Sequence, residues 1–274
     1  MHRPTEGRGS GQNKAPATWP RARGHPGQFV SLSVSALSCC AQVDALGSRP
    51  VSSSPPGPWV ERWLSAPRFQ TYLTAAGGDR TAAVELYEWN TTMSSVILHD
   101  LAHLEVAMRN VYNDALVARQ PEALHWTQDV RRYFPPTTSR AKNGTLVDLN
   151  DQPRKQIASA ITAAGGSTAP RGKVVAELMF GFWRYLTTSA HERQLWLPFL
   201  RHGFVSGTNR KQIDKPMGRL HMLRNRVAHH EPLLGDNLSG RRADELALLD
   251  RVSPDLRSYV ASTSTWATIE AQRP

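Results

Sequence analysis

The 274-residue chain has only two cysteines, the adjacent Cys39 and Cys40. Both lie near the N-terminus, so the rest of the chain can form neither a disulfide framework nor a cysteine-based zinc site. No stretch approaches the ~20 apolar residues of a membrane span, and no alternating run is long enough for a central β-strand. These absences favour a helical, cytoplasmic protein with no membrane partner.

Acidic side chains are the minority among the charged residues. The formal net charge is +10 and the isoelectric point is about 10.1. The excess is not confined to one tail, because 27 of the basic and 21 of the acidic side chains follow residue 50. Such a balance favours an acidic partner, with nucleic acid first and an anionic membrane second. The alternative is a basic surface without a partner.

The first 58 residues differ in composition from the rest, with 8 prolines and 7 glycines and no sustained apolar period. Such a segment cannot bury enough surface to offset its ordering entropy, so we predict a disordered extension over 1–57. An over-extended start site would also add a segment of this kind. The mildly apolar stretch Phe29–Ala41 follows Arg21 and Arg23 and faintly resembles a signal peptide. It is rich in serine and lies deep in the chain, so we expect the cytoplasm.

From Trp59 onward the pattern is helical. Asp79 predicts the cap of a long amphipathic helix that continues to about Ala118. Prolines and an Asn-Gly pair predict an irregular excursion around 120–152. We therefore predict an all-α bundle with a main helical domain over 58–240 and a C-terminal helical appendage over 241–274.

The most informative stretch is Leu223–Pro232, with the sequence LRNRVAHHEP. Asp214 can act as an N-cap and Pro216 fits a first turn, so we predict a helix from Lys215 to about Glu231. Arg224 falls inside its apolar stripe, which consists of Met217, Leu220, Leu223 and Val227. A charge on a buried face needs a partner, which can be a carboxylate, a ligand phosphate or a facing helix.

Arg224 and His229 are the chemically active pair of this stretch. A guanidinium stabilises phosphate charge, and an imidazole moves protons near neutral pH. On an ideal helix the two side chains point about 140° apart, from roughly 100° per residue. Two such helices meeting face to face could combine them, and a two-fold dimer interface is the simplest arrangement that does so. Asn225 and His229 are four residues apart and share an adjacent face.

The segment Arg224–His229, as R-N-x-x-x-H, resembles the signature of the HEPN superfamily, and LRNRVAHHEPL resembles its Abi-like (abortive infection) branch. Three further segments resemble that branch and occur in the family's order: Leu86–Asn90, Leu104–Asn110 and Val175–Leu186. Together they cover the chain from about Trp59 to about Pro232.

The resemblance implies a metal-independent endoribonuclease that needs no cofactor. Arg224 and His229 would be the catalytic residues of a homodimer, and Asn225 would orient His229 or contact the phosphate. Abi-like proteins look like phage-defence toxins, which implies RNA as the substrate and control by an antitoxin or a regulatory RNA.

Other polar residues allow two interpretations. Glu105, Arg109 and Asn110 could line the cleft near Arg224, or Glu105 and Arg109 could form an i,i+4 ion pair that only stabilises a helix. Glu177 has the same ambiguity. We expect His230 to be a supporting or surface group, because adjacent histidines on a helix point about 100° apart and rarely chelate one metal ion.

Two non-catalytic hypotheses remain beside the nuclease. One is a silent RNA-binding module that uses the same cleft. The other is a structural helical dimer, in which Arg224 forms a buried ion pair with Glu105 or Glu177.

Overall fold

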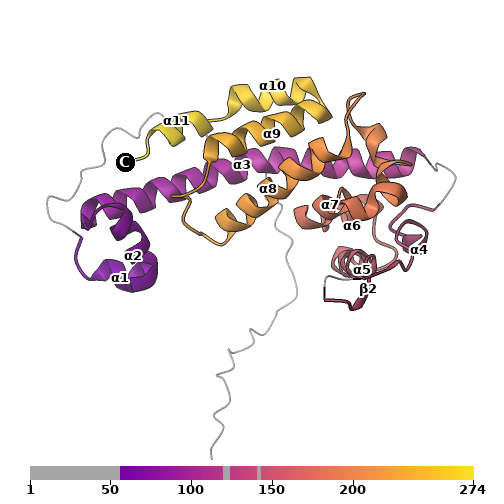
Figure 1. The fold of residues 1–274 in the computed structure, drawn as a ribbon, viewed down its shortest axis with the longest axis horizontal. Helices are drawn as coiled ribbons and strands as arrows, with labels where there is room; N and C mark the ends of the chain where they lie inside the picture. Colours follow the sequence, from indigo (N-terminus) through magenta and orange to yellow (C-terminus); the bar gives the residue numbers. More distant parts are fainter. Residues whose placement is uncertain (1–55, 120–123, 141–142) are drawn as a thin grey trace, which may run out of the picture. The chain divides into compact units, whose positions relative to one another are not determined.

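Helices dominate the structure (Figure 1), which confirms the predicted all-α class. The computed structural model describes residues 56–119, 124–140 and 143–274. Most of the predicted extension over 1–57, with both cysteines and the stretch Phe29–Ala41, lies outside the described residues. The described residues belong to one compact unit, Ser54–Pro274.

The elements follow one another in this order: α1 (Trp59–Leu64), α2 (Ala66–Ala75), α3 (Arg80–Ala118), α4 (Val130–Tyr133), β1 (Thr138–Arg140), β2 (Leu146–Asp148), α5 (Asp151–Ala164), α6 (Arg171–Ala176), α7 (Phe180–Leu186), η3 (Ser189–His191), η4 (Glu192–Trp196), η5 (Leu200–Gly203), α8 (Arg210–Ala228), α9 (Leu238–Val252), α10 (Pro254–Thr263) and α11 (Trp266–Ala271). Among the described residues, no helix is both long and apolar enough to cross a membrane.

The organising element is α3, a helix of 39 residues that is about 58 Å long at 1.5 Å per residue. Its start is fixed as predicted, because the Asp79 carboxylate accepts hydrogen bonds from the backbone N–H groups of Thr81 and Ala82. Figure 1 shows α8 and α9 alongside α3, and both contact it. The apolar side of α3 is therefore the surface on which the other helices of the bundle pack.

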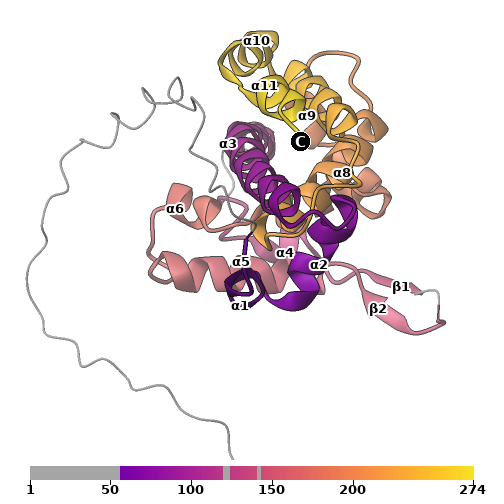
Figure 2. The ribbon, with the colours of Figure 1, turned by 90° about the vertical axis from the view of Figure 1, so that its left-hand side faces the viewer.

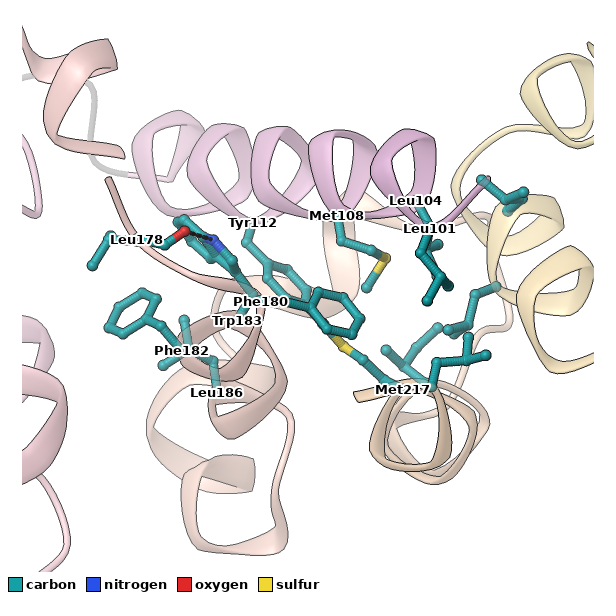
Figure 3. Close-up of a cluster of buried hydrophobic side chains, with 14 of the residues drawn as sticks. Leu101, Leu104, Met108, Tyr112, Leu178, Phe180, Phe182, Trp183, Leu186 and Met217 are labelled. Atoms are coloured by element: carbon teal, nitrogen blue, oxygen red, sulfur yellow. Dashed lines mark hydrogen bonds between the residues drawn. The ribbon is translucent and has the colours of Figure 1, made fainter. Parts of the chain in front are cut away.

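The main core lies where α3 meets α7 and α8 (Figure 3). Tyr112 of α3 is fully buried, donates a hydrogen bond to the Met217 sulfur at 3.6 Å, and packs its ring against Trp183. The Trp183 indole donates in turn to the Leu178 carbonyl oxygen at 3.1 Å. The aromatic side chains of α7 are thus core residues, and burying side chains of this size supplies much of the stabilising free energy.

A second apolar cluster joins α1 and α2 to the first turns of α3. Arg80 holds this corner, because its guanidinium forms an ion pair with Glu61 at 2.6 Å and donates to the carbonyl oxygens of Pro56 and Gly57. This fixes the entry of the chain into α3.

The C-terminal helices belong to the same core as α3 and α8, which differs from the appendage expected over 241–274. Leu248, Val260 and Trp266 are buried in that core. Arg242 of α9 also forms ion pairs with Asp100 of α3 at 2.9 Å and with Glu245 at 2.6 Å. Both carboxylates are almost completely buried. A pairing of buried charges between α3 and α9 makes this segment an integral part of the bundle.

The excursion expected around 120–152 contains the short α4 and a hairpin in its described part. Strands β1 and β2 pair antiparallel, with Ser139 opposite Val147, and Figure 2 shows the hairpin extending away from the helices. Asp148 accepts a hydrogen bond from Arg154 of α5 at 2.5 Å. This contact attaches the hairpin to α5, the helix that forms one side of the candidate site.

Candidate functional site

Helix α8, which carries the RNRVAHH motif, begins earlier than the sequence suggested. Asn209 is its N-cap, and the Asn209 and Gln212 side chains form a reciprocal capping box with each other's backbone N–H groups. The predicted start at Lys215, with Asp214 as the cap, is therefore wrong. Pro216 lies inside the helix, while the Asp214 carboxylate pairs with Arg210 at 2.9 Å.

The helix also ends earlier than predicted, at Ala228. His229 is the C-cap, and His230 has a left-handed backbone with φ of 54°. The backbone N–H groups of His230 and Glu231 donate to the carbonyl oxygens of Val227 and Arg226. These two bonds form a Schellman motif, in which the left-handed position usually belongs to glycine. The two histidines of the motif thus lie in the turn that ends the helix.

The loop after this turn is held from two sides. Arg226 forms ion pairs with Asp236 at 2.8 Å and Glu231 at 3.4 Å, and it donates to the Pro232 carbonyl oxygen at 2.8 Å. From α3, the buried Asn90 side chain accepts a hydrogen bond from the Leu233 backbone at 2.7 Å. The second arginine of the motif and Asn90 therefore hold the loop that follows the two histidines.

A groove opens between α5, α7 and α8 and has a volume of about 350 Å³. Its lining consists of Gln152, Gln156, Met179, Phe180, Gly181, Phe182, Tyr185, His221, Arg224 and Asn225. An adjoining hollow of about 300 Å³ shares four of these residues and adds Lys155 and Glu177. Each volume lies within the range of roughly 300–1,000 Å³ that is typical of small-molecule sites.

Arg224 projects into this groove from the side of α8 that also carries the core residues. Its side chain forms no ion pair and no hydrogen bond within the described residues, although it is partly buried. Within the described part of a single chain, Arg224 forms no ion pair with Glu105 or Glu177, the partners named in the structural-dimer hypothesis. A partly buried guanidinium without an internal partner is poised to bind an anion.

His221 is the functional candidate that the sequence analysis missed. Its ring contributes to the groove one turn before Arg224, and its Nε2 atom lies 3.4 Å from the Asn225 side-chain nitrogen. Partial burial, aided by the positive charges of Arg184 and Arg224, lowers the pKa of His221 below its ordinary value. The spacing of His221, three residues before Arg224, was the signal that could have revealed it.

The other predicted site residues lie outside the groove lining. His229 is exposed, and its only hydrogen bond among the described residues runs from its backbone to Asn225. His230 borders a separate hollow of about 80 Å³ beside Asn90 and Ser94 of α3. Glu105, Arg109 and Asn110 lie on α3, and in the described chain the i,i+4 ion pair of Glu105 with Arg109 is not formed. The structure thus brings Arg224 and Asn225 together, but not Arg224 and His229.

The structure contains no cluster of three or more histidine, cysteine or acidic side chains that could hold a metal ion, within residues 56–119, 124–140 and 143–274. Comparison with protein-family models, with curated proteins and with solved structures gives no significant match in any of the three. The fold and the groove therefore define a helical protein with a groove that contains one arginine without an internal partner in the described chain, and the resemblance to the Abi-like branch stays a prediction.

Proposed function

We propose that the chain is an Abi-like endoribonuclease of the HEPN type, which cleaves RNA without a metal ion by attack of the substrate's own 2′-hydroxyl. The observation that carries the proposal is Arg224, a partly buried guanidinium that lines a groove and has no internal partner in the described chain. The net charge of +10 adds support, because it favours a polyanionic substrate.

In this reaction the oxygen of the 2′-hydroxyl forms a bond to phosphorus, and the bond from phosphorus to the 5′-oxygen breaks. Arg224 holds the non-bridging oxygens as negative charge builds on the phosphorane. Asn225 borders the same groove and contacts the imidazole of His221. His229 transfers a proton at the 2′-oxygen or at the leaving 5′-oxygen. The products are a 2′,3′-cyclic phosphate and a 5′-hydroxyl.

A homodimer completes the site in this proposal. His229 is exposed and does not line the groove of its own chain. A two-fold arrangement of two α8 helices would let His229 of the partner subunit approach Arg224. Met222 adds an exposed apolar side chain, 58% accessible, to the outer face of α8. The proposed biological role is abortive infection in the bacterial cytoplasm, with an antitoxin or a regulatory RNA restraining the enzyme.

The test is incubation of purified protein with RNA and with the same sequence as DNA, in EDTA, followed by analysis of the 3′ ends. We expect cleavage of the RNA only, with 2′,3′-cyclic phosphate ends. Arg224→Ala and His229→Ala should each lower the rate at least about 10²-fold, whereas Arg257→Ala, at an exposed arginine of α10, should not. Equal cleavage of DNA, or full activity of both variants, would contradict the mechanism.

A silent RNA-binding module is the second candidate, and one observation favours it. A single chain presents the anion-binding groove without His229, so a monomer would bind RNA without turnover. Expression in a bacterium separates the two candidates. Toxicity that His229→Ala relieves supports the nuclease, whereas RNA binding without toxicity supports the module.

A further inference from the structure

The groove holds an imidazole that the R-N-x-x-x-H motif does not include. The His221 ring lies against Gly181 of α7, where a β-carbon would approach its Nε2 atom to 3.0 Å. The Phe180 ring lies 6.0 Å away between centroids and covers the same imidazole. His221 is therefore held in place by backbone and by an aromatic ring, beside the unpartnered guanidinium of Arg224.

The neighbours of His221 lower its pKa and so favour the uncharged form of its ring. The titratable groups around it are Arg184 and Tyr185 of α7 and Arg224 of α8, while α5 contributes the neutral Gln152 and Gln156. Burial and the two guanidinium groups lower the pKa of His221. The Tyr185 hydroxyl is already committed, because it donates to the Leu149 carbonyl oxygen at 2.9 Å. A neutral imidazole has a lone pair that can accept a proton.

The contact between Asn225 and Nε2 of His221 is longer than an ordinary hydrogen bond. The Asn225 amide lies 3.4 Å from Nε2 of His221, beyond the usual range of 2.7–3.2 Å for such bonds. A substrate hydroxyl can replace so long a hydrogen bond with little loss. Binding of a phosphate at Arg224 would also add a negative charge next to His221 and favour its protonation as the reaction proceeds.

We propose that His221 is a catalytic residue and accepts the proton of the 2′-hydroxyl, in the same subunit whose Arg224 binds the phosphate. This inference rests on the proposed ribonuclease function. The bond between O2′ and its proton breaks, and the proton moves to His221 while O2′ attacks phosphorus. His229 gives its proton to the departing 5′-oxygen. Exchange with water then returns both imidazoles to their starting states, and nothing is oxidised or reduced.

This assignment divides the proton transfers between two histidines with different surroundings. His221 lies within the groove and acts as the base, whereas the exposed His229 acts as the acid. One subunit then supplies the phosphate clamp and the base together. Only the acid depends on the dimer.

Cleavage kinetics of His221→Gln, with His103→Gln as the matched control, test the assignment. His103 is a partly exposed histidine of α3 whose ring contacts His99 and Tyr259 instead of the groove. We expect His221→Gln to lower kcat about 10²–10⁴-fold, with RNA affinity within about threefold. The fall in rate on the acid side of the wild-type pH profile should vanish in this variant, which loss of packing alone would not produce.

A second measurement on the wild type does not require the variant to fold. The ring resonances of His221 can be titrated by NMR with and without a ribonucleoside 3′-monophosphate. The nucleotide should move the midpoint of the His221 titration to higher pH in the wild type and have no such effect in Arg224→Ala.

The two proposals fail in different ways. If the wild type cleaves no RNA, the ribonuclease function is wrong and the role of His221 is wrong with it. If the wild type cleaves RNA while His221→Gln keeps its rate and pH profile, or the nucleotide leaves the His221 titration unmoved, only the role of His221 is overturned.

Discussion

Helix α8 carries arginines on two faces, and those on one face have carboxylate partners whereas Arg224 on the other has none within the described chain. On the side that meets α9 and the following loop, Arg219 donates to the Asp244 carboxylate at 2.6 Å and Arg226 pairs with Asp236 at 2.8 Å. At the start of the helix Arg210 pairs with Asp214. Arg224, on the groove side, has no such partner within the described chain.

The difference indicates which charges hold the fold together and which are free for a ligand. A paired arginine lowers the free energy of the folded chain through its carboxylate. An unpaired one on a partly buried surface raises it, and retention of such a group is typical of functional sites. Two arginines only two residues apart in the motif thus differ in their contacts, since Arg226 is paired with Asp236 and Arg224 has no partner within the described chain.

The sharpest test of this difference is removal of the unpaired arginine. Arg224→Ala should lower RNA cleavage at least about 10²-fold, because a charge-stabilising donor is lost. The free energy of unfolding should stay the same or rise slightly, because no internal contact is lost and an unpaired charge is removed from a partly buried surface. Parallel cleavage assays and urea denaturation measure the two effects, and a large loss of stability would show that Arg224 has a structural role.

Helix α9, which packs against α8, contains a buried carboxyl group, Glu245, whose ionisation should make the free energy of unfolding depend on pH. Burial raises the pKa of Glu245 from 4.5 to about 7 in the folded protein. Its folded-state pKa lies above the unfolded one, so its contribution is fully present below about pH 4.5 and is lost as the pH rises through about 7. Glu245→Gln should flatten the profile between pH 5 and 8, by on the order of 2–3 kcal/mol. Denaturation at four pH values checks this, and an equally steep profile in the variant would exclude Glu245 as the cause.

Removal of the paired arginine should have the converse effect to removal of Arg224. Arg226→Ala should lower the free energy of unfolding by about 1–2 kcal/mol, since Asp236 loses its ion-pair partner and the Pro232 carbonyl oxygen loses its donor. A double-mutant cycle sharpens the comparison. Arg226→Ala with Asp236→Asn should be less destabilising than the sum of the single changes, whereas Arg224→Ala with Asp236→Asn should be additive.

The smallest expected effect concerns the turn that ends the helix. His230→Gly should raise the free energy of unfolding by roughly 0.5–1 kcal/mol, because φ at this position is 54° and glycine adopts it without steric cost. Thermal denaturation measures the change. A destabilised variant would mean that the His230 ring contributes more in the hollow beside Asn90 than its backbone strain costs.

The sequence predicted the parts of this protein that depend on local chemistry. The Asp79 cap and the extent of α3 to Ala118 were predicted from the sequence alone, and the structure confirms both. The unusual place of Arg224 on the apolar stripe of α8 also followed from helical periodicity.

The remaining features depend on contacts between distant segments. The start of α8 was misplaced because Asp214 and Pro216 imitate a helix start, whereas the reciprocal Asn209–Gln212 pair determines it. His221 became visible only with α7, because Gly181 and Phe180 create its environment. The helical face expected to join Asn225 with His229 instead joins Asn225 with His221, since the helix ends at Ala228.

The place of the His221 ring in the groove depends on the absence of a side chain at Gly181. At Gly181 a single hydrogen faces the imidazole, and even a methyl group would come within 3.0 Å of the ring nitrogen. An alanine there would require the His221 ring to shift by a few tenths of an ångström, which would change the spacing between this imidazole and the Arg224 guanidinium. The spacing between the two proposed reactive groups, His221 and Arg224, therefore depends on a residue of α7 as well as on the sequence of α8.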